Sequence, residues 1–314
     1  MPCIPFFHIH GWGTAFFVPY LGAKLVLPGK AGPAEQLQLV QREGITWSNM
    51  VPTQIHMLLE AADRAGVGDL KGYKVATGGS PLPSGLAQRM RDKGMAYSLI
   101  YGGSDQLAAS ISVVPRGIEP GSPEAWEALR TGMLPLAMVE VRLEDGHGNA
   151  VPYDGKSIGE VLVRSPWLPD GYYKDPERSG ASYRDGWFRT GDLGVMNPNG
   201  TLYVVDRKKD AVKSGGEWIA TGVLEALISE HPGVAAVAVI AQPDERWGER
   251  PVAVVQAGGD VSASSLTSHL KAAAEQGRLA RFWIPDRFVF VQELPLTSAG
   301  KINKVTLRKE FGSG

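Results

Sequence analysis

Two segments of the chain combine side chains suited to binding a vicinal diol, the group that ribose presents. Phe188 to Leu193 reads FRTGDL and is expected to form a turn that ends in the carboxylate of Asp192. Tyr203 to Ile219 reads YVVDRKKDAVKSGGEWI and brings Arg207 within a short stretch of chain. A carboxylate accepts hydrogen bonds from hydroxyl groups, and a guanidinium donates them. The pair therefore predicts a ribose-binding site.

The second segment also has the composition of a hinge. A strand end at Leu202 to Val205 is followed by charges at Asp206 to Asp210, and then by Ser214-Gly215-Gly216. Glycine adopts backbone dihedrals that other residues resist, and hinges are short segments that absorb such changes. We therefore expect one part of the chain to rotate on another here.

Two glycine turns follow expected strands nearer the N-terminus. They are Thr77 to Ser80, which reads TGGS, and Tyr101 to Gln106, which reads YGGSDQ. In parallel α/β sheets ligands bind at the carboxyl ends of the strands, and glycines let a flat base approach the backbone closely. Taken alone, the first segment favours an ordinary tight turn.

The composition is that of an ordinary globular protein. The chain has 314 residues, of which 43% are hydrophobic and 21% are charged, enough for two domains. The net charge of −1 gives no nucleic-acid footprint. The single cysteine, Cys3, excludes an intrachain disulfide and suits a reducing cytoplasm. The sequence shows no apolar run of membrane-spanning length and no signal peptide at Met1.

Hydrophobic periodicity predicts an α/β region, then a β-rich region, then a small α+β domain. Strands are expected at residues 4–10, 22–28, 46–51, 73–77, 96–101, 137–144 and 157–164, the last with alternating inward and outward residues. Helices are expected at 33–43, from Pro52, at 84–93 and at 124–130. The last domain is expected to hold a three-stranded sheet (strands 234–240, 251–255 and 287–291) with helices 223–231 and 264–275.

Three motifs occur in an order that identifies a family. FRTGDLG, DRKKDAVKSGGEWI and PLTSAGKINK together resemble the acyl-adenylate-forming superfamily, and within it the AMP-forming medium- and long-chain fatty-acyl-CoA synthetases. The resemblance implies a partial large adenylation domain at residues 1–205, with an α/β part (1–110) and a β-rich part (111–205). A hinge at 206–210 and a small mobile C-terminal lid at 211–314 follow.

The resemblance also implies site residues for the nucleotide. Tyr101 matches a tyrosine that stacks on adenine, Ser104 takes the place of a threonine that contacts the α-phosphate, and Asp192 matches the diol-binding aspartate. The remaining implied nucleotide contacts are Gly78, Gly79, Ser80, Gly102 and Arg207. Asp105 replaces a family glutamate that helps to hold Mg²⁺, and because aspartate is one methylene shorter a water is expected to bridge it to the metal.

The N-terminal PFFHIHGWG resembles the acyl-pocket motif of the family. His8 matches its histidine, Trp12 resembles a tryptophan that gates the acyl tunnel, and Gly103 is placed in the same pocket. Read without the resemblance, His8 and His10 form either an incomplete metal site or, as preferred, a turn with packed imidazoles.

The family chemistry has two half-reactions. Lys301 matches the lysine that neutralises the acyl carboxylate and α-phosphate while ATP and the acid form acyl-AMP and pyrophosphate. The small domain then turns about Lys209, which brings Lys213, Ser214, Gly215 and Gly216 to the adenylate for attack by the thiol of coenzyme A. Fatty acid, ATP, Mg²⁺ and coenzyme A are the implied ligands, and a homodimer of the complete parent is left open.

The family's serine- and glycine-rich phosphate loop lies before the acyl-pocket motif and is not found in this sequence. The chain is therefore expected to be an incomplete form of the parent, with Ile4, Phe6 and Phe7 exposed. Three other readings stay open: a non-catalytic nucleotide- or acyl-binding fragment, a ligase that delivers acyl-AMP to a carrier protein, and a luciferase-like oxidoreductase.

We expect the isolated chain to adenylate fatty acids poorly or not at all. Pyrophosphate release after addition of ATP and a fatty acid measures this. Release at a rate close to that of full-length relatives would contradict the expectation.

We expect Asp105→Glu to lower the magnesium concentration that the activity requires, because the longer side chain reaches the metal directly. The measurement is activity against magnesium concentration for both forms of the complete parent. An unchanged magnesium requirement counts against a metal role for Asp105.

Overall fold

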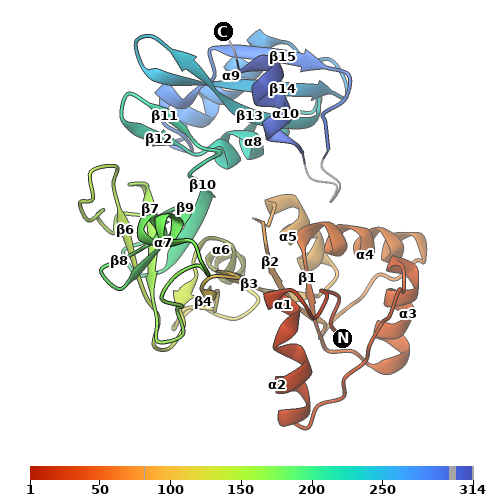
Figure 1. The fold of residues 1–314 in the computed structure, drawn as a ribbon. Coiled ribbons are helices and arrows are strands. Elements are labelled where there is room, and N and C mark those ends of the chain that lie inside the picture. Colours follow the sequence, from red (N-terminus) through yellow and green to blue (C-terminus); the bar gives the residue numbers. More distant parts are fainter. Residues whose placement is uncertain (81, 297–301, 313–314) are drawn as a thin grey trace.

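The computed structural model of the chain describes residues 1–80, 82–296 and 302–312. Figure 1 shows an N-terminal part built on one sheet, a second sheet beside it, and a C-terminal part that β10 joins to the rest. The predicted fold class, a large α/β and β-rich part followed by a small α+β domain, is confirmed. In the described part of the chain, the helices include none long and apolar enough to cross a membrane.

The first sheet has the strand order β1-β2-β3-β4-β5. Strands β1, β2 and β3 are parallel, and β4 and β5 are antiparallel to their neighbours. The strands are β1 Trp47–Met50, β2 Lys74–Gly78, β3 Ala96–Gly103, β4 Leu107–Ile111 and β5 Leu134–Pro135. The helices of this part are α1 Ile9–Trp12, α2 Thr14–Tyr20, α3 Pro33–Glu43, α4 Pro52–Arg64, α5 Ser84–Asp92 and α6 Pro123–Thr131.

Helix α4 shows how the sequence builds the crossovers of this sheet. Pro52 takes the first helical position, where its missing N–H costs nothing, and Val51 before it is extended. Residues three and four apart form an apolar stripe that is fully buried: Ile55, Leu58, Leu59 and Ala62. This stripe joins the core of the first sheet, so α4 carries the chain from β1 to the parallel strand β2.

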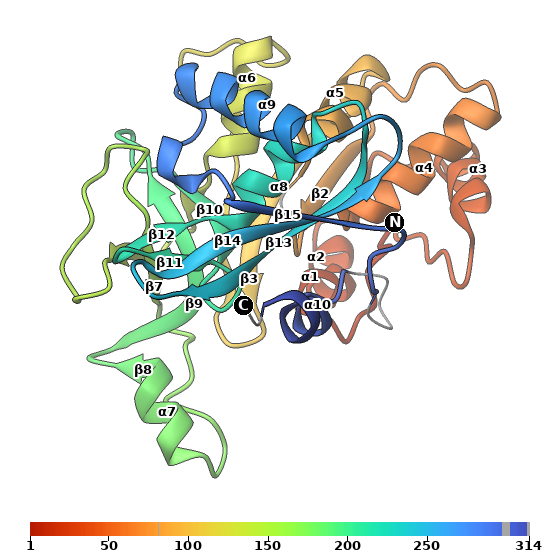
Figure 2. The same cartoon turned by 90° about the horizontal axis from the view of Figure 1, so that it is seen from above.

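The second sheet is antiparallel, in the order β10-β9-β7-β6, with β8 paired to β9. Its elements are β6 Glu140–Glu144, β7 Gly159–Arg164, α7 Pro176–Ser182, β8 Tyr183–Arg184, β9 Trp187–Met196 and β10 Leu202–Arg207. Helix α7 and β8 project from one side of the molecule in the view from above (Figure 2).

The C-terminal domain holds the third sheet, in the order β12-β11-β14-β13, with β15 parallel to β14. Its strands are β11 Val212–Ser214, β12 Glu217–Ile219, β13 Val234–Asp244, β14 Gly248–Ala257 and β15 Arg287–Val291. Its helices are α8 Thr221–Ser229, α9 Ala263–Glu275, the 3-10 turn Arg281–Trp283 and α10 Lys304–Phe311. Separate apolar clusters pack on the two faces, with α8 and α9 on one and α10 on the other.

The expectation of a three-stranded sheet in this domain is wrong, because β11 and β12 extend it. Gly215 and Gly216 have φ values of +59° and +88°, so the glycine pair forms the tight turn of a β-hairpin. Two successive residues with positive φ are typical of the hairpin turn whose twist matches that of its strands. The glycine pair that suggested hinge flexibility is therefore fixed in a regular turn.

The strands expected at residues 4–10 and 22–28 are also absent from the described structure. Short helices α1 and α2 occupy residues 9–12 and 14–20 instead, and residues 23–28 lack regular structure. Ile4 is 7% exposed, against the expectation, whereas Phe6 and Phe7 are exposed as expected. Further large apolar side chains are exposed on and after these helices: Trp12, Phe16, Phe17, Tyr20, Leu21 and Leu27.

Candidate active site

The carboxylate of Asp192 lies where β3, β9 and β10 come together. Its Oδ2 accepts a hydrogen bond from the hydroxyl of Tyr101 at 2.7 Å. Its Oδ1 lies 2.7 Å from Nε of Arg207, which is its register partner on β10. The structure thus brings together the tyrosine, the carboxylate and the guanidinium that the sequence placed in the nucleotide site.

Thr190 holds the backbone of Asp192 in place, a contact that was not predicted from the sequence. Its Oγ1 donates to the carbonyl of Val161 at 2.8 Å and accepts from the backbone N–H of Asp192 at 3.0 Å. The turn expected at 188–193 is wrong: these residues lie inside β9, where Gly191 has a φ of +71° and the pairing with β7 is irregular. Such an irregularity re-aims a side chain, here that of Asp192.

The electrostatics of the three side chains differ. Asp192 is 5% exposed, and burial raises its pKa while the charge of Arg207 opposes the rise. Burial and the neighbouring Asp192 both raise the pKa of Tyr101, so its hydroxyl is a neutral donor at neutral pH. The side chain of Arg207 is 61% exposed, which makes it the partner that an incoming diol can displace most easily.

The carboxyl ends of β2 and β3 lie at the same edge of the first sheet, because the two strands are parallel. Gly78 ends β2, Gly79 and Ser80 follow it, and Gly102 and Ser104 lie at the end of β3. A Cβ at Gly78 would lie 2.4 Å from the carbonyl oxygen of Ile100. A larger residue at position 78 would therefore clash with β3. Contact of this turn with a nucleotide stays a prediction.

Asp105 lies in the turn between β3 and β4 and is half-buried. Among the hydrogen bonds and ion pairs of the described residues, none uses its carboxylate, which leaves the oxygen donors that Mg²⁺ prefers. Burial, Tyr172 and then Asp105 raise the pKa of Tyr183 to about 12. Asp105 fits an outer magnesium ligand, and no group of three or more metal-binding side chains occurs within the described ranges.

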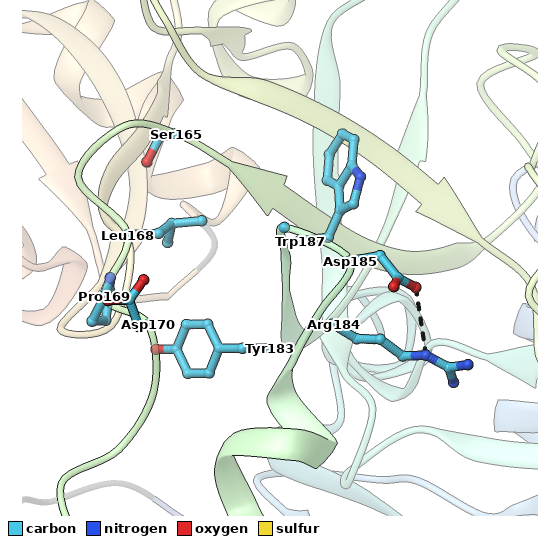
Figure 3. A pocket seen from close by; sticks show the side chains of 9 residues that line it. Ser165, Leu168, Pro169, Asp170, Tyr183, Arg184, Asp185 and Trp187 are labelled. Carbon is cyan, nitrogen blue, oxygen red and sulfur yellow. Dashed lines mark ion pairs between the residues drawn. The ribbon is translucent and has the colours of Figure 1, made fainter.

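A hollow of about 350 Å³ lies next to this turn, between the loop Ser165–Asp170 and the hairpin Tyr183–Trp187 (Figure 3). Trp167 of the same loop donates from Nε1 to the carbonyl of Gln106 at 3.2 Å, so the loop supports the turn that carries Asp105. The hollow is lined by none of the residues predicted for the nucleotide. The hollow is therefore separate from the predicted nucleotide site.

The predicted acyl-pocket residues lie on and around α1, which packs beside β4. The Nδ1 atom of His8 accepts from the N–H of His10 at 3.2 Å and so caps α1. Trp12 is 54% exposed and packs against Phe16 in a tilted arrangement, with ring centroids 5.1 Å apart and ring planes inclined by 51°. Gly103 is the last residue of β3, the strand next to β4. Their role in acyl binding stays a prediction.

The predicted coenzyme A residues form the hairpin β11-β12. The Nζ atom of Lys213 lies 5.4 Å from the ring centroid of Trp218, and the N–H of Gly215 donates to the carbonyl of Trp247 at 2.8 Å. Ser214 is 3% exposed and accepts from Arg250. Within the described part of the chain, no hydrogen bond or ion pair joins this hairpin to Tyr101 or Asp192.

A buried ionic network lies next to the candidate site and was not expected. Arg189 donates to Glu144 and to Glu160, each at 3.1 Å, and Lys208 lies 2.9 Å from Glu160. Both carboxylates are less than 9% exposed, although the alternation of residues 157–164 placed Glu160 on an outward face. The alternation was misleading because both faces of β7 are covered. A carboxylate on a covered face is stable only when nearby cations pair with it.

The two remaining predicted residues belong to the hinge and the C-terminal domain. Lys209 is exposed in the turn after β10, and the part of the chain described here offers it no side-chain hydrogen bond. Lys301 lies outside the described residues. Its role stays a prediction, as does the role of Lys209 as pivot.

Comparison with protein families identifies both parts of the chain. Residues 1–173 match the AMP-binding enzyme family, and residues 223–301 match the AMP-binding enzyme C-terminal domain. A long-chain-fatty-acid–CoA ligase of Thermus thermophilus is 36% identical over 317 residues, which are 99% of this chain and 58% of that protein. A medium-chain-fatty-acid–CoA ligase of Ectopseudomonas oleovorans is 34% identical over 99% of the chain and 57% of its own length. The chain thus spans somewhat more than half the length of these relatives.

Solved structures show the same arrangement. o-Succinylbenzoate CoA synthetase of Bacillus subtilis, in complex with its acyl-adenylate intermediate, is 29% identical with a TM-score of 0.79. The similarity covers 98% of this chain and 60% of that one.

Asp192→Asn is expected to weaken the binding of AMP to the chain by roughly 10- to 100-fold, because a charged acceptor for the ribose hydroxyls is lost. Isothermal titration calorimetry measures the affinity. Glu230→Gln, which changes an exposed carboxylate on the C-terminal domain paired with Arg278, is the matched control and is expected to bind AMP as the parent does.

The ligand offers a second control. The 2′,3′-dideoxy form of AMP lacks the diol, so the parent and Asp192→Asn are expected to bind it equally and weakly. Equal affinity of the parent for AMP and for the dideoxy nucleotide contradicts the assignment of Asp192 to the diol.

Proposed function

The chain belongs to the AMP-binding enzyme family, and from this premise we propose that the protein is an AMP-forming acyl-CoA synthetase that acts on medium- or long-chain fatty acids. The proposed reaction forms acyl-AMP and pyrophosphate from ATP and the acid, and then acyl-CoA and AMP from acyl-AMP and coenzyme A. The relatives named as fatty-acid–CoA ligases support this choice of substrate class.

The observation that carries the proposal is the carboxylate of Asp192 between Tyr101 and Arg207. It provides a buried, oriented acceptor for the ribose hydroxyls, with an aromatic ring beside it for the base. The carboxylate is preorganised, because Thr190 fixes its backbone and two donors already satisfy its oxygens. The hydroxyl groups of an entering ribose would take the place of donors that already bind the carboxylate, so little reorganisation is required.

The chemical difficulty of the first half-reaction is the approach of two anions. A carboxylate must attack an α-phosphate, and cationic groups are required to offset the charge in the transition state. We assign this work to Lys301 and to Mg²⁺ that enters with ATP, with Asp105 as an outer oxygen ligand and Ser104 at the α-phosphate. Tyr101, Asp192 and Arg207 hold the nucleoside in the same place throughout.

We assign the second half-reaction to the other side of the small domain. A turn of that domain about Lys209 would withdraw Lys301 and bring the β11-β12 hairpin to the adenylate. The position of a side chain at Gly216 is open, which leaves space for the narrow pantetheine arm of coenzyme A, whereas the ring of Trp247 packs against Gly215. Lys213 supplies a cation close to that arm. His8, Trp12 and Gly103 are assigned to the acyl chain.

Delivery of the acyl group to a carrier protein is the second candidate function. It shares the first half-reaction and differs only in the thiol that attacks. The small-residue hairpin and the relatives named as CoA ligases favour free coenzyme A. Comparison of coenzyme A with phosphopantetheinyl carrier protein as acceptor separates the two.

The proposed activity is tested in a chimera in which residues 1–314 replace the aligned part of the Thermus thermophilus ligase. Acyl-CoA formed from acids between octanoate and palmitate is measured by mass spectrometry, with acetate as the control acid. Acyl-CoA formation that requires ATP and magnesium supports the proposal, and a folded chimera that forms none of these products contradicts it.

In the same chimera, Lys301→Ala is expected to slow acid activation by roughly 100-fold or more, because the transition state loses a cation. Pyrophosphate release measures this step. Thioester formation from presynthesised acyl-AMP is expected to stay within a fewfold of the parent rate, as is acid activation by the control variant Lys271→Ala. Equal losses in both half-reactions contradict the assignment of Lys301 to the first.

A further inference from the structure

Four of the five charged residues at 206–210 make side-chain contacts, and these divide by sign: the two bases bind the large part, and the two acids bind the small domain. Arg207 pairs with Asp192, and Lys208 pairs with Glu160, so the two bases bind carboxylates of the large part. Asp210 lies 3.1 Å from Arg308 of α10 in the small domain. These three residues therefore contact the part of the protein that lies on their own side of Lys209.

Asp206 differs, because it precedes Lys209 and yet contacts the small domain. Its Oδ2 accepts hydrogen bonds from the backbone N–H and, at 2.7 Å, from the hydroxyl of Thr221, and from the N–H of Gly222 at 3.3 Å. These are the first residues of α8. Among the described residues that precede Lys209, it is the only one whose side chain makes a hydrogen bond or ion pair with a residue that follows Lys209.

Helix α8 depends on this carboxylate for its cap. Its own N-cap residue is Ala220, which has no side chain to accept from the exposed N–H groups. A carboxylate at a helix N-terminus satisfies such donors and complements the partial positive charge of the helix end. The end of β10 lies close to the start of α8, because a Cβ at Gly222 would lie 3.1 Å from the carbonyl oxygen of Val205.

The cap is linked to α10 as well. The Nζ atom of Lys304 donates to the hydroxyl of Thr221 at 2.9 Å and lies 2.7 Å from Glu225. Glu225 is half-buried, and its partial burial raises its pKa while Lys304 opposes the rise. The start of α8 and the start of α10 are thus held together, so the contact of Asp206 with α8 fixes both helices relative to β10.

We propose that Asp206 is a positioning residue that holds the small domain in the orientation seen here, and that its cap on α8 must open before the domain turns about Lys209. The turn itself rests on the proposed function, whereas the cap is a contact of the present structure. An apolar cluster also crosses the hinge, in which Leu193, Val195 and Val205 of the large part pack with Ala211 and Ala220. Such contacts are non-directional, so they do not select one orientation. The directional contact is the one that selects the orientation.

The experiment measures the domain orientation directly. Nitroxide labels at Glu124→Cys and Lys271→Cys, both exposed and on opposite sides of the hinge, are placed in a Cys3→Ser background, and pulsed electron paramagnetic resonance gives their distance distribution. The parent is expected to give one dominant distance. Asp206→Ala is expected to lower the population at that distance relative to all others by roughly fivefold, the usual effect of losing a cap.

Two variants make the result specific. Asp206→Asn keeps an acceptor but loses the charge, so it is expected to fall between the parent and Asp206→Ala, and its near-identical shape preserves folding. Asp210→Ala removes the same charge from the same hinge but breaks a pair inside the small domain, so the dominant distance is expected to persist.

A distribution in Asp206→Ala equal to that of the parent overturns the proposal, as does an equal shift in Asp210→Ala. Both distance distributions are measured in the absence of nucleotide. A chain that shows the Asp206 effect but fails to bind AMP would therefore disprove the proposed function and leave the positioning role in place.

Discussion

The structure depends on one buried carboxylate whose two oxygens are held by different strands. Asp192 receives the hydroxyl of Tyr101 from the first sheet and the guanidinium of Arg207 from the last strand of the second. A buried carboxylate is costly unless such donors are present, so the contact fixes the two sheets relative to each other at this point. The same requirement limits what can displace a partner, because an incoming group must offer an O–H or N–H donor or a cation to keep the charge satisfied.

The hinge follows from the same strand. β10 ends in Asp206 and Arg207, and neighbouring residues of a strand point to opposite faces. Arg207 therefore reaches back to Asp192, whereas Asp206 reaches forward to α8. Lys208 adds a second contact on the side of the large part through the buried Glu160. The run of charges looks like a solvated loop in the sequence, yet Asp206, Arg207, Lys208 and Asp210 each bind a partner in one part of the protein.

Much of this arrangement could be predicted from the sequence, because helices and parallel strands are local and periodic. Helix α3 begins and ends at the residues predicted for it, and the strands of the first sheet other than β4 and β5 were located within a few residues. The N-terminal segment was predicted wrongly as a strand, because an apolar run with β-branched residues fits a strand or a buried helix equally well. Glu160 was placed on an outward face, since the residues that cover and pair it, Arg189 and Lys208, come from elsewhere in the chain.

The glycine pair shows why the remaining contacts could not be predicted from the sequence. Gly215-Gly216 was taken as a source of backbone freedom, yet both residues have the positive φ values of a hairpin turn, and their strands extend the third sheet. Glycine permits rotation and it also permits a tight fixed turn, and only the pairing partners distinguish the two outcomes. Because both glycines belong to a paired hairpin, the rotation that we propose for the small domain would be absorbed before it, between Arg207 and Asp210. The exposed turn at Lys208 and Lys209 is the place where the backbone could change without breaking a strand. Among the described residues before this turn, Asp206 alone makes a side-chain hydrogen bond across it, so this bond is the directional contact that the proposed rotation would break.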